Sequence, residues 1–156
     1  MRLVARTLLA GLPLLATAPA AEAQDGMLGR WATPGVAAIV ELAPCPGAAT
    51  LCGTIRWLWE AVDEKGRPRL DVQNADASLR SRPMIGLSIL SGLAPAAGGG
   101  WAGRIYNPED GQTYNATVRR TGPDALLVEG CVLIVCRKQV WRKASVVAEA
   151  LGSSSR

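Results

Sequence analysis

The residues best suited to bind a ligand lie in one short stretch, residues 103–114, which reads GRIYNPEDGQTY. An arginine close to two tyrosines can hold a carboxylate or a sugar hydroxyl group. The predicted ligand-binding residues are Arg104, Tyr106, Asn107, Asp110 and Tyr114. The alternative is an ordinary β-turn, since Pro108 presets φ and Gly111 supplies a positive φ for the returning strand. The turn does not explain why Arg104 and Tyr106 share one face of their strand.

Acid and base catalysis would have to use carboxylates, because the chain contains no histidine. The absence of histidine excludes His-based triads and most zinc and copper sites. Two pairs of adjacent acids are candidates, Asp63 with Glu64 and Glu109 with Asp110. Neighbouring residues in a strand point apart, and acids in loops are usually solvated. A carboxylate-dependent hydrolase is therefore kept only as an alternative, and we expect no catalytic residue.

A metal site is not predicted either. Asp71, Asn74 and Asp76 resemble a calcium loop in composition, but the glycine and the distal glutamate of an EF-hand are missing. Helix capping explains these residues better, with Asn74 or Asp76 starting a short helix through Arg82 that Pro83 ends. We expect no metal and no cofactor.

Four cysteines, Cys45, Cys52, Cys131 and Cys136, predict disulfides in an oxidising compartment. The strand-forming sequences beside them favour two local bridges, Cys45–Cys52 and Cys131–Cys136. A crossed pairing and a metal site made of all four thiolates are the alternatives.

The first bridge predicts a hairpin between residues 36–43 and 51–59. If the two cysteines face each other, the opposed apolar pairs are Val40 with Trp57, Leu42 with Ile55, and Ala38 with Trp59. On the other face Glu41 lies opposite Arg56, and we expect this ion pair to be structural. A slip of one residue would destroy both features.

The second bridge predicts a hairpin with the pairs Glu129 with Lys138, Leu127 with Val140, and Leu126 with Trp141. Its tip, residues 132–135, consists of four apolar residues where a turn is normally polar. We expect the tip to fold over an end of the barrel and be buried. The alternative is that it stays exposed for a partner or a ligand.

Eight strands are predicted in all, joined mostly by short connections rich in glycine, proline and aspartate. They span residues 28–33, 36–43, 51–59, 84–92, 101–107, 112–120, 124–131 and 136–142. Such a series predicts an all-β fold, an eight-stranded antiparallel meander that closes into a calycin-like barrel. Residues 60–83 form one long loop with a short helix, which is well placed as a lid over the barrel mouth.

The N-terminus predicts export. Two arginines precede an apolar run that ends in the small-residue pattern Ala21-Glu22-Ala23, so residues 1–23 are predicted to be a signal peptide. We expect one barrel domain over residues 24–143, a partly disordered tail with one helical turn over residues 144–156, and no transmembrane segment. The predicted location is the periplasm or the outside of the cell. The charge excess, +4, is small and scattered, which argues against nucleic acid as a partner.

Several stretches carry a likeness to a known family. They are Gly29-Arg30-Trp31, Cys45 with Leu51-Cys52-Gly53, Trp101 with residues 103–111, and Gly130-Cys131 through Cys136-Arg137 to Trp141. They resemble a family of small exported bacterial proteins, the domain of unknown function 2147. The resemblance implies no particular activity.

The opening pair, Gly29 and Trp31, also resembles the Gly-x-Trp of calycin barrels, which include the lipocalins. In those barrels the tryptophan sits at the closed end under an arginine from the last strand. The resemblance implies a structural Trp31 covered by Arg142 or Arg137 through cation–π stacking.

These observations together predict a non-catalytic binder of a small molecule or an envelope component. The predicted alternative is a protein-interaction module that docks through residues 132–135.

Overall fold

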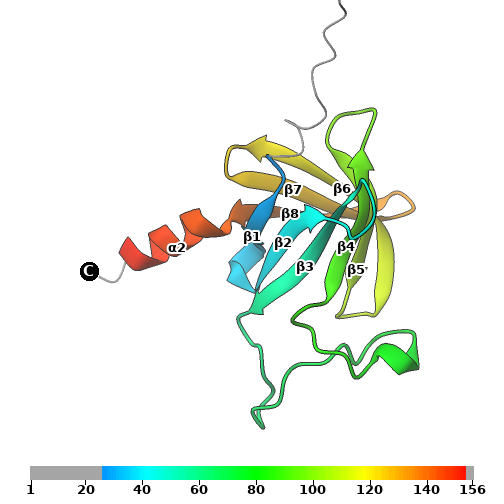
Figure 1. Cartoon of the computed structure of the whole chain (residues 1–156), viewed down its shortest axis with the longest axis vertical. Coiled ribbons are helices and arrows are strands. Elements are labelled where there is room, and N and C mark those ends of the chain that lie inside the picture. Colours follow the sequence, from blue (N-terminus) through cyan, green and yellow to red (C-terminus); the bar gives the residue numbers. More distant parts are fainter. Residues whose placement is uncertain (1–25, 154–156) are drawn as a thin grey trace, which may run out of the picture.

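The computed structural model describes residues 26–153, which form a closed barrel of eight antiparallel strands in sequence order (Figure 1). The strands are β1 (Gly29–Ala32), β2 (Ala38–Pro44), β3 (Leu51–Leu58), β4 (Ser88–Pro95), β5 (Trp101–Asn107), β6 (Gln112–Gly122), β7 (Ala125–Val132) and β8 (Val135–Lys143). Two 3-10 helices, η1 (Pro34–Val36) and η2 (Ala77–Leu79), and one α-helix, α2 (Ala144–Ser153), complete it. The predicted eight-stranded antiparallel meander is confirmed. The predicted signal peptide, residues 1–23, lies outside the described residues.

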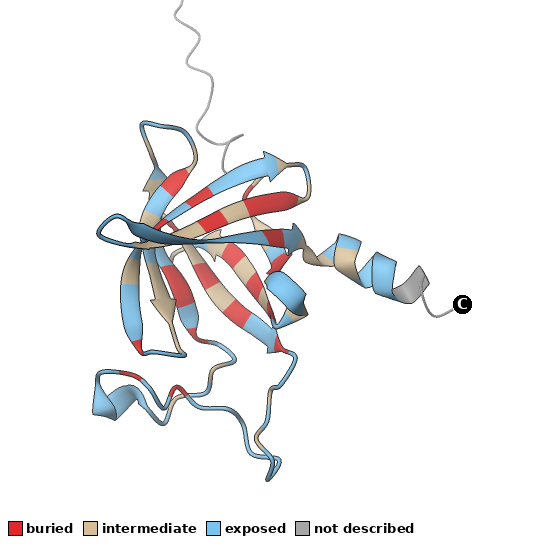
Figure 2. Ribbon diagram, turned by 180° about the vertical axis from the view of Figure 1, so that it is seen from behind, coloured by how far each residue is buried: buried red, intermediate tan, exposed pale blue. Residues whose placement is uncertain are grey.

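Inward-facing side chains of the strands form the hydrophobic core, and the residues buried in this way alternate along the strands (Figure 2). Trp31 is fully buried, and its indole N–H donates to the Met27 carbonyl oxygen at 2.9 Å. The cation that covers its ring is Lys143, whose Nζ lies 5.2 Å from the ring centre. Lys143 is directly opposite Trp31 in the β1–β8 pair, whereas Arg142 is opposite Ala32 and is exposed. The expected cover by Arg142 or Arg137 is therefore wrong.

The barrel closes through a short seam. Strands β1 and β8 share two residue pairs, Trp31 with Lys143 and Ala32 with Arg142. Strand β1 ends there because Pro34 and Gly35, the latter with φ 67°, turn the chain into η1. The closing strand is thus the shortest of the eight.

The first hairpin has the predicted disulfide, Cys45–Cys52, but not the predicted register. The observed pairs are Ile39 with Trp57, Val40 with Ile55, Leu42 with Gly53, and Ala43 with Cys52. The two cysteines are therefore diagonal neighbours and not opposed ones. The predicted pairs of Val40 with Trp57, Leu42 with Ile55 and Ala38 with Trp59 are wrong, and Glu41 lies opposite Thr54 and not opposite Arg56.

The register is set at the turn, where the Cys45 N–H donates to the Thr50 carbonyl oxygen at 2.8 Å, and a β-bulge at Arg56 shifts it by one residue farther along the hairpin. Between the Ile39 and Val40 pairs the register skips Arg56, so that this residue is the extra one on β3. Arg56 and Trp57 consequently both face outward, and Leu58 is the next buried residue. Glu41 still accepts from Arg56 at 2.7 Å, as predicted, and from Arg30 at 3.4 Å.

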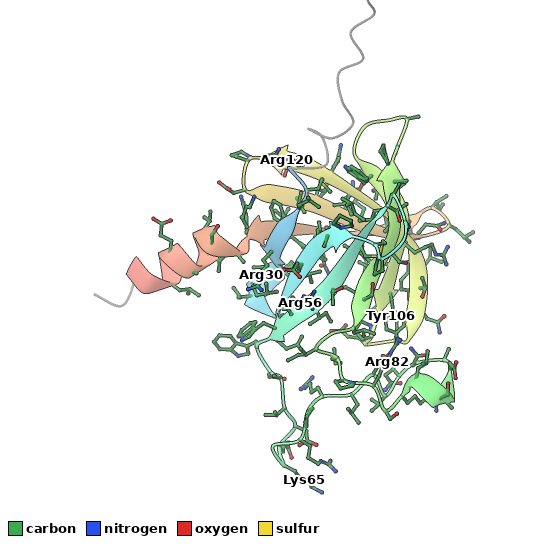
Figure 3. All side chains as sticks on the ribbon, in the orientation of Figure 1. Arg30, Arg56, Lys65, Arg82, Tyr106 and Arg120 are labelled. Carbon is green, nitrogen blue, oxygen red and sulfur yellow. A yellow bond between two sulfur atoms is a disulfide. The ribbon has the colours of Figure 1, made fainter. Side chains whose placement is uncertain are left out.

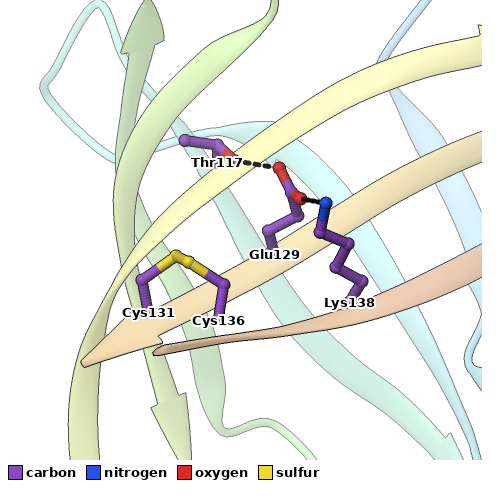
Figure 4. Close-up of a disulfide and its surroundings, with 5 residues drawn as sticks. All are labelled: Thr117, Glu129, Cys131, Cys136 and Lys138. Carbon is purple, nitrogen blue, oxygen red and sulfur yellow. Dashed lines mark hydrogen bonds and ion pairs between the residues drawn. A yellow bond between two sulfur atoms is a disulfide. The ribbon is translucent and has the colours of Figure 1, made fainter. Parts of the chain in front are cut away.

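The second hairpin matches its predicted register throughout. The disulfide Cys131–Cys136 joins opposed residues, and Glu129 pairs with Lys138. The Lys138 ammonium group lies 2.9 Å from Glu129, which also accepts from Thr117 at 3.1 Å, and Figure 4 shows both contacts.

The tip of this hairpin is exposed, which corrects the expected burial. Leu133 and Ile134 each expose 95% of their surface. Strand pairing continues as far as Val132 with Val135, so two residues alone make the turn. A turn this short cannot fold back over the barrel, and the tip projects away from it (Figure 1).

The loop between β3 and β4 hangs from one end of the barrel (Figure 1). It contains only η2, which Asp76 caps by accepting from the Ser78 N–H at 2.9 Å. The predicted helix through Arg82 does not form, because the segment makes bonds of the 3-10 type, from the Leu79 N–H to the Asp76 oxygen and from the Arg82 N–H to the Leu79 oxygen. Strand β4 begins at Ser88, four residues later than predicted, because Gly86 adopts φ 93° just before it.

Helix α2 follows β8 directly and points away from the barrel (Figure 1). Its 10 residues are more than the single helical turn expected for the tail. Within the described part of the chain, no helix combines the length and apolar character needed to cross a bilayer.

Candidate binding site at the barrel mouth

The strand alternation separates the five predicted ligand-binding residues. Arg104 faces the outside of β5, where its Nη1 donates to Asn115 Oδ1 at 2.7 Å. Tyr114 lies opposite Ile105 and lines the barrel interior with it. The structure therefore does not bring Arg104 together with Tyr114. Asp110 contacts Asn107 and Tyr114 at the β5–β6 turn, whereas Tyr106 contacts the long loop.

Asp110 is the centre of a hydrogen-bond cluster in the β5–β6 turn. Its Oδ2 accepts from the Tyr114 hydroxyl at 2.6 Å and from Asn107 Nδ2 at 2.8 Å. Its Oδ1 accepts from the backbone N–H of Gln112 at 2.9 Å. Burial raises the pKa of Asp110, but these hydrogen bonds and the charge of Arg137 outweigh it and lower the pKa below 3.8. The ionised carboxylate fixes both the turn and the Tyr114 ring.

Tyr106 instead contacts the long loop through a buried carboxylate, Asp71. The Tyr106 hydroxyl donates to Asp71 Oδ1 at 2.5 Å, and Asn74 Nδ2 donates to Oδ2 at 2.8 Å. Arg82 completes the cluster, with Nη2 2.8 Å from Asp71 Oδ2. Its guanidinium carbon lies 5.7 Å from the centre of the Tyr106 ring, and Figure 3 shows the two side chains side by side. The cluster fastens the loop to the end of β5.

The charge state of Asp71 follows from these partners. Asp71 is fully buried, and burial raises the pKa of its carboxyl group. The hydrogen bonds from Tyr106, Asn74 and Arg82 lower the pKa by more, so that it falls below 3.8. Burial, with the hydrogen bond to Asp71, raises the pKa of Tyr106 above 10.0. The pair is thus an ionised acid and a protonated phenol.

A second contact holds the loop against the β5–β6 turn. The backbone of Gly111, at φ 69°, packs so closely on the loop that a Cβ atom there would overlap the Gln73 carbonyl oxygen. Only glycine fits this approach. Turn geometry alone predicts a glycine at this position, and the approach of the loop is an additional constraint.

A cavity of about 500 Å³ opens at this end of the barrel. Its lining comes from the β1–β2 connection, the end of β3, the start of β4, the β5–β6 turn and the β7–β8 hairpin. The apolar walls include Ile55, Leu58, Ile89, Ile105 and Val128. The polar groups at the lining include Tyr114, Asp110, Arg137 and Gln139. An apolar interior with a few polar groups is the usual form of a small-molecule site.

A larger groove of about 1060 Å³ adjoins the cavity between the barrel end and the long loop. The two share the lining residues Ala37, Leu58, Met84, Pro108 and Glu109. Trp59 lines the groove with 70% of its surface exposed and meets Trp57 edge to face at 6.1 Å. The predicted register placed Trp57 and Trp59 on the apolar face of the hairpin, but both are exposed, because the bulge at Arg56 turns Trp57 outward and Leu58 inward.

Three acidic residues, Asp63, Asp110 and Glu41, have structural partners. Asp63 accepts from the Arg67 Nε and backbone N–H groups, each at 2.9 Å, and the Arg67 hydrogen bonds lower the pKa of Asp63. Glu41 lies between Arg56 and Arg30, whose hydrogen bonds lower its pKa in the same way. Among residues 26–153, no three Cys, Asp or Glu side chains are grouped so that they could hold a metal ion.

Three lining or anchoring residues were missed as site residues. Arg137 and Gln139 line the cavity, and the Gln139 Oε1 accepts from the buried Trp141 indole at 2.9 Å. The alternation of side chains along β8 could have predicted that both line the interior, since Gln139 and Arg137 are two and four positions before the inward-facing Trp141 and share its face. Asp71 gave no such signal, because its partners are up to 35 residues away in the sequence.

A closed eight-stranded meander with a cavity at one end is the architecture of a lipocalin-type barrel. The solved structure of protein HP1028 from the human pathogen Helicobacter pylori, described as belonging to the lipocalin family, matches with a TM-score of 0.63. The match has 19% sequence identity and covers 75% of this chain and 82% of that chain, so it shows a shared fold. No curated protein matches the chain.

The family model described as "Uncharacterized protein conserved in bacteria (DUF2147)" matches residues 29–143. The chain therefore belongs to the DUF2147 family, as its sequence stretches predicted. Both expected resemblances, to this family and to lipocalin-type barrels, are confirmed.

Proposed function

We propose that this protein binds a small molecule with an apolar body and an anionic or polar end in the cavity at the barrel mouth. The observation that carries the proposal is the cavity itself, about 500 Å³, with aliphatic walls and Arg137 at its lining. Ligand pockets of proteins commonly measure about 300–1,000 Å³. Of the residues predicted from the sequence, Tyr106, Asn107, Asp110 and Tyr114 lie at this cavity.

The apolar and charged residues that line the cavity would bind different parts of the ligand. Aliphatic side chains such as Ile105 and Val128 would bury the body of the ligand, which is the main source of affinity. Arg137 would hold the anionic end by charge-assisted hydrogen bonds. The long loop would act as the lid, because its inner face forms the groove through which the cavity is reached.

Anilinonaphthalene sulfonate, which joins apolar rings to an anion, is a suitable probe. Val128→Trp would fill the cavity, since Val128 faces inward with 2% of its surface exposed. Val140→Trp is the matched control on the neighbouring strand, where Val140 faces outward with 44% exposed. Saturable binding should persist in Val140→Trp and weaken at least about tenfold in Val128→Trp, with both proteins melting normally. Equal binding by the two variants would refute the cavity as the site.

Arg137→Gln tests the polar end. Loss of a charge-assisted hydrogen bond should weaken binding of the sulfonate by about tenfold or more. An uncharged apolar probe should bind this variant as well as it binds the unmodified protein. If both probes weakened equally, Arg137 would be shaping the cavity and not binding the anion.

The proposed setting is outside the cytoplasm, in the periplasm or beyond it. Two disulfides are typical of proteins that fold in an oxidising compartment, and residues 1–23 have the pattern of a signal peptide. Intact mass measurement of the protein from a periplasmic extract tests this, with a chain beginning at Gln24 as the expected result. A chain that begins at Met1 would contradict it.

A further inference from the structure

The apolar tip, residues 132–135, lies outside the hydrophobic core of the barrel. Leu133 and Ile134 are 95% exposed, Val135 is 70% exposed and Val132 is 53% exposed. Single exposed apolar residues are common, but four in succession at a protruding point are not. The tip therefore needs an explanation other than folding.

The local backbone makes the choice of residues more unusual. Leu133 has φ 51°, a left-handed conformation that residues other than glycine, asparagine and aspartate rarely adopt. Two-residue hairpin turns with a positive φ at their first position favour glycine there. A leucine at this place is unfavourable both for the backbone and for its exposure to water, which argues for selection of the side chain itself.

The tip is also held rigidly. Strand pairing reaches Val132 and Val135, and the disulfide Cys131–Cys136 joins the next pair below. Figure 4 shows this bridge at the end of the two strands. The backbone that carries the four side chains therefore has little conformational entropy left to lose on binding.

Three cations, Arg137, Lys138 and Arg104, lie near the tip, whereas the other four cations of β6 and β8 lie toward the opposite end of the strands. Arg137 and Lys138 follow the tip directly in β8. Glu129 forms an ion pair with Lys138, and the acid near Arg137 is Asp110, in the β5–β6 turn. A further cation, Arg104, is on β5. It pairs with Asn115 of β6, which in turn pairs with Cys131 of β7.

We propose that the apolar tip inserts into the interfacial region of an anionic lipid bilayer, with Arg137, Lys138 and Arg104 near the headgroups. An aliphatic finger requires no matching shape in a lipid, whereas a protein partner would have to supply a pocket. The residues that dominate protein–protein binding are Trp, Tyr and Arg, and the four tip residues include none of them. Apolar insertion plus basic residues is the two-part signal that gives reversible membrane attachment.

The position of the tip determines which end of the barrel would face the membrane. Val132 and Val135, at the base of the tip, also line the mouth cavity. Insertion of the tip therefore brings the cavity opening next to the lipid surface. The inference itself rests on the tip and its charges, and it stands whether or not the cavity binds a ligand.

Flotation with phosphatidylcholine vesicles, with and without phosphatidylglycerol, tests the proposal on the mature protein with both disulfides intact. We expect binding to the anionic vesicles, at least about tenfold weaker binding to the neutral ones, and a marked loss when salt rises from about 0.1 M to about 1 M. Absence of binding to anionic vesicles would overturn the proposal.

The variant Leu133→Gly with Ile134→Ser separates lipid binding from folding. It relieves the positive φ, so the melting temperature should stay or rise while vesicle binding falls at least about tenfold. The matched control is Val62→Ser with Ile85→Ser, which removes two residues of the long loop that are 51% and 45% exposed. The control should bind vesicles normally.

Two outcomes would contradict the assignment of the tip. Unchanged vesicle binding by the tip variant would place membrane contact elsewhere. Loss of a dimer or of a protein complex in this variant, with no vesicle binding by the unmodified protein, would mark the tip as a protein-docking surface instead.

Discussion

The long loop and the apolar tip leave the same end of the barrel and are ordered in opposite ways. The loop is polar, contains only three helical residues, and is held by hydrogen bonds to one buried carboxylate, Asp71. The tip is apolar, exposed and held by a covalent bond. The informative residues are in both cases those that break the usual burial rule, a buried aspartate and an exposed leucine. Order in the loop depends on tertiary contacts, whereas order in the tip is local.

Removal of the Asp71 carboxylate should have the largest effect. Asp71→Ala leaves Tyr106, Asn74 and the guanidinium of Arg82 without their acceptor, which should lower the free energy of unfolding by about 3 kcal/mol. The measurement is chemical denaturation together with limited proteolysis, and cleavage within residues 60–83 should accelerate. Glu60→Ala, which removes the exposed ion pair between Glu60 and Arg69 in the same loop, is the control and should change neither. Equal effects of the two variants would show that the cluster does not hold the loop.

The covalent support of the tip should matter somewhat less. Cys131→Ser with Cys136→Ser opens a loop of six residues, and the chain-entropy model gives a loss of about 2 kcal/mol. The proteolysis rate of the long loop should not change, because its contacts lie elsewhere. Thermal unfolding and the same proteolysis assay measure the two quantities. Faster cleavage in residues 60–83 would mean that the two regions are coupled.

The glycine contact beneath the loop allows a matched measurement. Gly111 and Gly66 have similar positive φ values, 69° and 73°, but only at Gly111 does a Cβ atom meet the loop backbone. Gly66→Ala should cost about 1 kcal/mol through backbone strain alone. Gly111→Ala should cost at least about 1 kcal/mol more, through displacement of the loop. Identical denaturation midpoints would argue against close packing of loop and turn.

Acid should loosen the loop and leave the tip unchanged. The pKa of Asp71 in the folded protein is lowered below its ordinary value of 3.8. Its contribution to stability is therefore complete above that value and is lost as the pH falls through the lower, folded pKa. At about pH 3 the backbone amides of residues 71–82 should exchange faster with solvent. Asp71→Asn should remove this acid-induced increase in exchange. Faster exchange at residues 131–136 over the same range would contradict the assignment to Asp71.

The smallest expected effect is at the tip. Leu133→Gly removes the strain of φ 51° and should raise the free energy of unfolding by about 0.5 kcal/mol. Thermal denaturation of the single variant measures it. A clear loss of stability would mean that Leu133 makes a contact that supports the fold.

The barrel and both disulfides could be predicted because the signals for them are local. Strand periodicity, turn residues and cysteines five and seven positions apart each act over a few residues. The Cys131–Cys136 register was predicted correctly since a two-residue turn leaves no alternative. The longer turn before Cys52 allowed another register, and the bulge at Arg56 shifted the end of β3.

The parts that could not be predicted depend on contacts between distant residues. Asp71 reads as a loop residue until Tyr106, from another strand, supplies its partner. The groove between the loop and the barrel likewise exists only once both are in place. The exposure of the tip could not be predicted, because an apolar sequence alone predicts burial and says nothing about the turn geometry that prevents burial.

Strands β1 and β8 share only two residue pairs, and this short pairing affects how copies of the protein could associate through strand edges. Over most of its length β8 pairs with β7 alone among the described residues, so its other side is an open strand edge. Such an edge can recruit a strand from a second molecule, and charged side chains, lysine above all, are a common defence against this. Arg137 and Lys138 sit on that edge. Electrostatic repulsion between these residues would keep neighbouring molecules from joining edge to edge when many are crowded on one surface.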